Sequence, residues 1–400
     1  MTDGRPPTRA TVRRRRRAAL AAITTTLLAL AGASVAVLSG PGGNRPRYRP
    51  PGAIARQLPL THARLITPSV STFRPTPAAL ALAARMPPAA AVAQLFMVRP
   101  AAVRGSGWGG VVLTRADRLA PSRVAALVAR LDGGAPASGP RPLIAAAQNG
   151  GPESALPGLP PRSQPAEAAT GDPTVAEDDA LAAGRALRRL GVAMTLAPLA
   201  DVDVPSGALS GELFGEDPVN VGRFTTAAVI GYAQAGEIAA VAHFPGEGAA
   251  SSDPDSSPAT VGGSLAALQA RDLVPFAAVA GRAPVVVMSN ASYVAFDGVT
   301  PASVSASAIS LLRNTLHFQG VIMSDDLDAA LQPTAETPAG LAVTALRAGE
   351  DLLYIGGDPG EAAAAYAGVL SAARRDGSVR ALVHEALLRV LTLKARWGLL

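Results

Sequence analysis

A run of acidic residues directly follows an apolar stretch near the C-terminus of this 400-residue chain. Gly320–Met323 leads into Ser324-Asp325-Asp326-Leu327-Asp328. A carboxylate at the end of a buried strand can act as the nucleophile of a glycosidase. The same carboxylates could instead accept the first backbone N–H groups of a following helix. Asp326 and Asp328 fit that capping role better, and Asp325 directly follows Ser324 at the end of the run.

A histidine ends a second apolar run. His243 closes the stretch Ile238–His243 and stands just before Pro245-Gly246, a pair that predicts a sharp turn. The polar loop 249–258 follows and carries Asp253 and Asp255. We expect this loop to be mobile and able to close over a substrate. Two alternatives stay open: the histidine could be structural, and the loop could be an ordinary solvated surface.

Weaker signals stand at the ends of two further apolar runs. Asn149 follows one run, and Asp201 and Asp203 follow another, where they could simply cap loops. The chain has no cysteine, which excludes disulfides, thiolate metal sites and a cysteine nucleophile. Its four histidines are scattered without metal-ligand spacing, so we expect neither a metal nor a cofactor.

The elements that must position these residues alternate between strands and helices. Most strand candidates are apolar throughout, as in parallel strands buried on both faces. Amphipathic helical stretches separate them, including Val175–Leu190, Ser264–Val279, Ser303–Leu316 and Ser378–Arg396, and Asp217-Pro218 and Thr337-Pro338 are helix-start signals. The eight strand candidates are Val92–Val98, Gly110–Leu113, Pro142–Ala147, Ala193–Ala197, Ile238–His243, Pro284–Met288, Gly320–Met323 and Asp351–Ile355.

Eight such alternations predict an α/β fold of the (β/α)8 barrel type. An open doubly wound sheet is the alternative, although no Gly-x-Gly-x-x-Gly follows the first strand to indicate a dinucleotide site. In a barrel the active site lies at the C-terminal ends of the strands. The polar residues that follow the apolar runs are therefore expected to meet there.

The N-terminus has the composition of a targeting segment. Five consecutive arginines, Arg13–Arg17, precede an apolar stretch from Ala18 to about Leu38. This pattern predicts a signal anchor or a cleaved signal peptide over residues 1–39, rather than a buried core helix. Residues 40–77, rich in Pro, Arg and Gly, are expected to form a disordered linker, and residues 78–400 the globular domain.

The charge distribution agrees with that division. The net charge is +6, yet the first fifty residues alone hold ten Arg and one Asp. The basic character therefore belongs to the N-terminus and predicts no nucleic-acid partner. Arginines before the apolar stretch favour a domain outside the cytoplasm, either on a single-pass membrane anchor or secreted.

Several of these segments, taken together, resemble the family 3 glycoside hydrolases, particularly the bacterial β-N-acetylhexosaminidase branch. The order and spacing of the motifs match from about Val92 to the C-terminus. The segment Ala348–Leu353 adds a further similarity before the last strand. The principal motifs are Ala197–Val202, Phe214–Pro218, His243–Gly246 and Gly320–Leu327.

The resemblance implies a retaining glycosidase that acts on carbohydrate. Asp325 stands at the position of the family's nucleophile, and His243 at that of a sugar-contacting histidine. Asn149, Glu212 and Asn290 are the further residues expected to bind substrate.

The family pattern fails at several of these positions. Its Asp-x-Glu-Gly-Gly motif has Ala147 and Asn149 in place of the two acids. Its sugar-binding Arg is replaced by Glu212, and its Lys before the histidine by Ala242. These losses remove charged hydrogen bonds to sugar, each worth about 1.5–3 kcal/mol.

The general acid is also changed. The branch carries an Asp-x-His on the loop after the fifth strand, and here Asp255 stands in place of that histidine. Asp255 is the candidate acid/base, with Glu212, Glu216 and Glu247 as other candidates. The degenerate site leaves a second hypothesis open: an impaired family member that binds glycan or an envelope partner.

Overall fold

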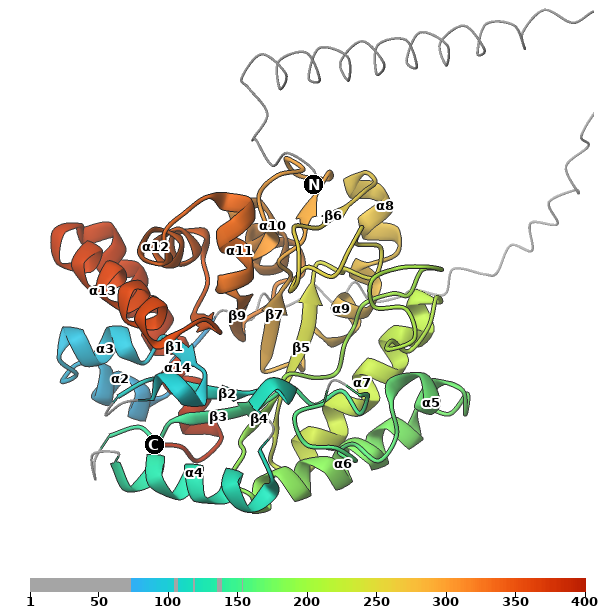
Figure 1. Cartoon of the computed structure of the whole chain (residues 1–400), viewed down its shortest axis with the longest axis horizontal. Coiled ribbons are helices and arrows are strands. Elements are labelled where there is room, and N and C mark those ends of the chain that lie inside the picture. Colours follow the sequence, from blue (N-terminus) through green and yellow to red (C-terminus); the bar gives the residue numbers. More distant parts are fainter. Residues whose placement is uncertain (1–72, 104–106, 118, 135–138, 153) are drawn as a thin grey trace, which may run out of the picture. The chain divides into compact units, whose positions relative to one another are not determined.

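The folded part of the chain begins near Phe73. The computed structural model describes residues 73–400, apart from 104–106, 118, 135–138 and 153 (Figure 1). The expected signal or anchor and most of the expected linker lie outside the described residues. Phe73, within the range expected as linker, lies under the Arg389 guanidinium, 4.3 Å from it. No helix among the described residues is both long and apolar enough to cross a bilayer.

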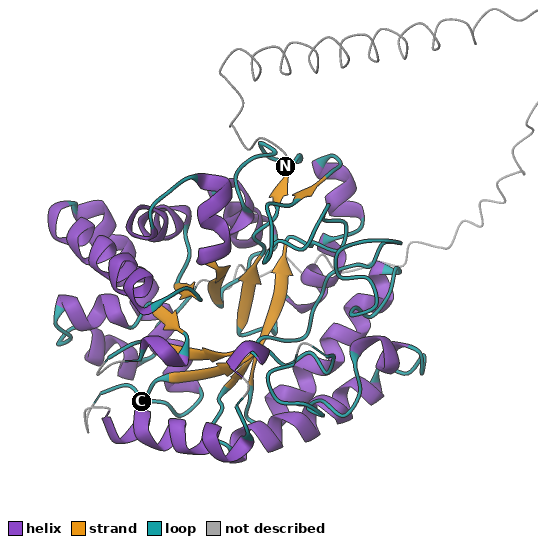
Figure 2. Cartoon of the chain, in the orientation of Figure 1, coloured by secondary structure: helices purple, strands orange, loops and turns teal. Residues whose placement is uncertain are grey.

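Eight parallel strands close into a barrel in the order β1-β10-β9-β7-β5-β4-β3-β2. This closure confirms the predicted (β/α)8 fold and excludes the open doubly wound sheet. The helices lie around the outside of the strands (Figure 2). The barrel strands are β1 (Phe96–Val98), β2 (Gly110–Leu113), β3 (Leu143–Ala146), β4 (Met194–Thr195), β5 (Ile238–Phe244), β7 (Val285–Met288), β9 (Val321–Asp326) and β10 (Leu352–Ile355).

Two helix-start signals in the sequence are confirmed. Asp217 and Thr337 each accept a backbone N–H of the helix that follows, and a proline occupies the first position of both helices. The α-helices are α2 (Pro77–Ala83), α3 (Pro88–Ala93), α4 (Pro121–Gly134), α5 (Gln164–Ala168), α6 (Thr174–Arg189), α7 (Pro218–Gln234), α8 (Leu265–Ala270), α9 (Leu273–Val279), α10 (Ala306–Ser310), α11 (Leu327–Thr334), α12 (Pro338–Ala348), α13 (Pro359–Arg375) and α14 (Gly377–Arg396).

Some predicted boundaries were wrong. Val92 and Ala93 end helix α3, which starts at Pro88, so the first strand is confined to Phe96–Val98. The stretch Ser264–Val279 is two helices that break before Leu273. Proline lacks an N–H to donate, and the break places Pro275 in the first turn of α9, where none is needed.

The hydrophobic periodicity of the sequence did not predict two further features of the fold. Ser303–Leu316 divides into a 3₁₀ turn (Ala302–Val304), α10 and a π-helical turn (Leu311–Thr315). A second, two-stranded sheet pairs β6 (Thr260–Val261) with β8 (Ser292–Tyr293). Two-residue strands are too short to show an alternating pattern.

The strand ends determine where the candidate residues meet. β5 runs one residue past His243, and β9 continues through Asp325 to Asp326. Because all strands of the barrel run parallel, both residues lie at the C-terminal end of the barrel. The only lysine of the sequence, Lys394 of α14, is buried. Its ammonium donates to the side chain of Gln94 and to the Gly109 carbonyl.

Candidate active site

Asp325 is held at the end of β9 with one oxygen fixed. Its Oδ1 accepts the backbone N–H of Asp326 at 2.8 Å. Burial raises the pKa of Asp325 to about 7, although the nearby His243 acts in the opposite direction. A carboxylate that is fixed, desolvated and close to neutral in pKa is well placed for nucleophilic attack.

Two buried carboxylates hold His243. Its Nδ1 lies 3.0 Å from Asp201 Oδ2 and 3.2 Å from Glu247 Oε1. Two acceptors at one nitrogen require that Nδ1 carry a proton, so neither carboxylate engages Nε2. Burial by itself would lower the pKa of His243, but Glu247 and Asp201 outweigh it and raise the pKa well above its usual value.

Asp201 also fixes the backbone around the histidine. Its carboxylate accepts the N–H of His243 at 3.2 Å and that of Glu247 at 2.8 Å. The turn between them requires Gly246, which has a φ of 117° and would clash with Asp272 if it carried a Cβ. Asp201 is fully buried, so it acts as a positioning residue rather than as a loop cap.

Glu247 is a second carboxyl with a pKa near neutral. Burial raises the pKa of Glu247 to about 7, while the His243 charge acts to lower it. Its Oε2 accepts a 2.6 Å hydrogen bond from Ser289, which follows β7. With both oxygens engaged by protein groups, Glu247 supports His243 and is a poorer candidate for the acid than Asp255.

Asp255 lies on a loop that is closed at its base. The bridge between Ala250 and Val261 joins the two arms, and the Asp255 N–H donates to Asp253 Oδ1 at 2.9 Å. The residue remains exposed on the loop. The charge of Asp325 is nevertheless the largest cause that raises the pKa of Asp255 well above its usual range, followed by desolvation. The two carboxyl groups therefore lie within electrostatic reach of each other.

The other residues that the sequence predicted to bind substrate are already hydrogen-bonded within the protein. Asn149 and Glu212 form a pair, with Asn149 Nδ2 donating to Glu212 Oε2 at 3.3 Å, and both are half-buried. Asn290 is buried and fully engaged, because it donates to the Asp326 carbonyl at 2.7 Å and accepts from Ser303 at 2.6 Å. In this arrangement Asn290 fixes the end of β9. Asn149 is engaged as well, because its Oδ1 accepts the N–H of Gly151 at 3.2 Å and the hydroxyl of Ser154 at 3.2 Å.

Asp326 has the capping role that the sequence predicted. Its side chain accepts the N–H groups of Asp328 at 3.0 Å and of Gly356 at 2.7 Å. These bonds join α11 to the segment after β10 and fix the residue next to Asp325. Asp328 lies in the first turn of α11.

Sequence reasoning missed the supporting roles of Asp201 and Ser289. The signal for Asp201 was its place after a strand, which it shares with ordinary loop caps. Ser289 follows β7 without a distinctive neighbour. The described residues contain no group of three or more His, Cys, Asp or Glu arranged to hold a metal.

Comparison with known proteins identifies the family. The model described as "Glycosyl hydrolase family 3 N terminal domain" matches residues 104–393. The chain belongs to glycoside hydrolase family 3. A "Beta-hexosaminidase" of Xanthomonas oryzae pv. oryzae is 34% identical over 257 residues, which cover 62% of this chain and 75% of the relative.

Two solved structures agree with the barrel. A glycoside hydrolase family 3 β-N-acetylglucosaminidase from a Paenibacillus species has a TM-score of 0.72 and 28% identity, covering 78% of this chain and 63% of that one. A β-N-acetylhexosaminidase from Beutenbergia cavernae has a TM-score of 0.69 and 29% identity, covering 78% and 99%. The family resemblance seen in the sequence motifs is confirmed.

The contact between Asp201 and His243 yields a prediction. Asp201→Asn removes one of the three carboxylate charges that raise the pKa of His243, so we expect that pKa to fall. Titration of the histidine ring signals by NMR measures it, with the His243 signal assigned by its loss in His243→Gln. Asp132→Asn, a change at an exposed surface acid, is the matched control and should leave the signal unmoved. An unchanged His243 pKa in Asp201→Asn would contradict the assigned role.

Proposed function

We propose that this protein is a retaining β-N-acetylhexosaminidase-like glycosidase, with Asp325 as nucleophile and Asp255 as general acid/base. The observation that carries the proposal is that His243 and Asp325 stand at the ends of β5 and β9, at the same end of the closed barrel, and that the loop with Asp255 follows β5. The family membership and the names of the relatives favour a hydrolase over a protein that only binds glycan.

The first chemical step uses the two carboxyls in opposite protonation states. Ionised Asp325 attacks the anomeric carbon while protonated Asp255 gives its proton to the leaving oxygen. Two carboxyls within reach of each other do not ionise together readily, so the charge of Asp325 keeps the proton on Asp255. Asp255, now ionised, then takes a proton from water as the water hydrolyses the glycosyl-enzyme.

His243 contributes a positive charge at the same place. Its raised pKa keeps the imidazolium charged at neutral pH, and that charge favours ionisation of Asp325. Its Nε2, which neither Asp201 nor Glu247 engages, would donate to a sugar hydroxyl. Asn149 and Glu212 lie in the loops after β3 and β4, where they supply amide and carboxylate groups for further hydroxyls.

The nucleophile assignment is tested on aryl glycosides. Purified full-length protein should release aryl alcohol from an N-acetylglucosaminide or a related β-glycoside, and Asp325→Ala should abolish the release, because no glycosyl-enzyme can form. A 2-fluoro or 5-fluoro sugar should label Asp325 in mass spectrometry. Asp132→Ala is the matched control and should retain full activity. Failure of the whole panel and of the label would refute the enzyme proposal.

The pH dependence tests the acid/base. Activity needs Asp325 ionised, so kcat/KM should rise with pH up to about 7, the pKa of Asp325, and fall again when Asp255 loses its proton. Asp255→Asn should remove the alkaline limb and lower kcat/KM by about 10²–10⁴-fold for poor leaving groups. The loss should be smaller for a dinitrophenyl leaving group, which needs no proton. An unaltered alkaline limb would assign the acid to another residue.

We infer that the N-terminal segment carries the barrel out of the cytoplasm, as an anchor or as a cleaved signal. The support is the run Arg13–Arg17 followed by an apolar stretch, together with the proposed glycan substrate. Replacing the five arginines with glutamate should retain the protein inside the cell. Immunoblots of cell fractions measure this, and a wild-type chain found in the cytoplasm would contradict the inference.

A further inference from the structure

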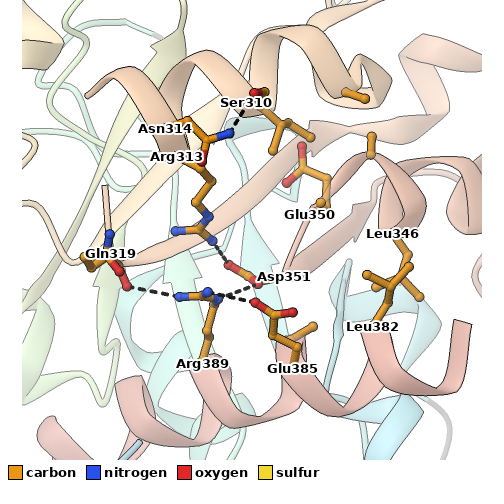
Figure 3. Close-up of a pocket in the computed structure, with 15 residues that line it drawn as sticks. Ser310, Arg313, Asn314, Gln319, Leu346, Glu350, Asp351, Leu382, Glu385 and Arg389 are labelled. Atoms are coloured by element: carbon orange, nitrogen blue, oxygen red, sulfur yellow. Dashed lines mark hydrogen bonds and ion pairs between the residues drawn. The ribbon is translucent and has the colours of Figure 1, made fainter. Parts of the chain in front are cut away.

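A cavity of about 450 Å³ lies at the N-terminal ends of β9 and β10, the end of the barrel opposite to Asp325. Helices α10, α12 and α14 and the π-helical turn surround it (Figure 3). Its walls combine apolar and charged side chains, including Ile309, Arg313, Leu346, Glu350, Leu382 and Arg389.

Glu350 is the unusual member of this wall. The residue is 1% exposed, and neither carboxyl oxygen has a hydrogen-bond partner among the described residues. In Figure 3 its carboxyl points toward the helix that carries Ser310 and Asn314, and no dashed line reaches it. A buried carboxyl without a partner costs free energy that a matching ligand would recover.

The other charges of the cavity are already satisfied within the protein. Arg313 pairs with Asp351 and donates to the Gly320 carbonyl at 2.6 Å. Arg389 lies 2.9 Å from Glu385 and 3.5 Å from Asp351. Both arginines are thus engaged with other groups, and neither donates a hydrogen bond to Glu350.

We propose that this cavity binds a small organic cation, a primary ammonium on a short aliphatic body, with the ammonium donating to Glu350. An ammonium has donors for both carboxyl oxygens, and the apolar Ile309, Leu346 and Leu382 would contact the aliphatic part. The site is separate from the glycosidase proposal and does not depend on it.

Binding of a cation at this site should release a proton. Burial raises the pKa of Glu350 well above its usual value, the Asp351 charge adds to that effect, and Arg313 opposes it. These effects favour the protonated form of the free carboxyl, and the charge of Asp325 acts in the same direction. A cation favours the ionised form, so its arrival should expel a proton from Glu350.

Calorimetric titration of the full-length protein tests the site, with pentylamine as the probe and pentan-1-ol as its neutral match. We expect pentylamine to bind with one-to-one stoichiometry and release about one proton at pH 7, measured from buffers of different ionisation enthalpy. Pentan-1-ol should bind at least ten-fold more weakly. Glu350→Gln should weaken amine binding by at least ten-fold and eliminate the proton release.

Two further variants separate the site from general effects. Glu336→Gln, at an exposed acid outside the cavity, is the matched control and should bind as the wild type does. Leu382→Trp fills the cavity while Glu350 stays, and it should weaken binding if Glu350→Gln proves unable to fold. Equal binding by Glu350→Gln, equal binding of the alcohol, binding of inorganic phosphate instead, or no amine binding at all would each overturn the proposal.

Discussion

The arrangement at the mouth of the barrel depends on one electrostatic balance, in which the charge of the His243 imidazole offsets the negative charge of several buried carboxylates. Asp201 and Glu247 contact the same nitrogen of His243, and Asp325 lies within reach of its charge. Isolated charges in such a place would be neutralised by protonation. The imidazolium permits some of the carboxyls to ionise while others keep a proton, which is the asymmetry that two-carboxyl glycoside hydrolysis requires.

The same balance explains how the site can differ from the family pattern. The sequence motifs predict that Ala242 and Glu212 stand where the family has a sugar-binding Lys and Arg. In the proposed mechanism His243 supplies positive charge at this place. The motifs also predict that Asp255 stands where the family has its acid/base histidine, and the raised pKa of Asp255 comes first from Asp325 rather than from burial. The proposed acid therefore depends on the nucleophile for its proton.

The barrel places its two notable carboxyl sites at opposite ends of adjacent strands. Asp325 closes β9 at the C-terminal end, whereas Glu350 stands just before β10 at the N-terminal end. Asp201, Glu247 and Asp325 lie close to His243, whereas the carboxyl of Glu350 has no hydrogen-bond partner among the described residues. That difference favours chemistry at one end and ligand binding at the other.

The sequence by itself determined the barrel, the family and the residues at the strand ends. Eight short apolar runs that alternate with helical stretches favour buried parallel strands, and parallel strands bring their ends together, so Asp325 and His243 could be assigned to one site. Helix starts such as Asp217-Pro218 depend on adjacent residues alone, so the sequence also predicted them. Only the tertiary structure decided that Asp201 holds His243 from 42 residues away, and that Asn290 is fully engaged in supporting β9. It also showed that Glu350 lines a cavity without a partner. Hydrogen bonding and desolvation depend on which distant segments pack together, and composition and spacing along the chain do not contain that information.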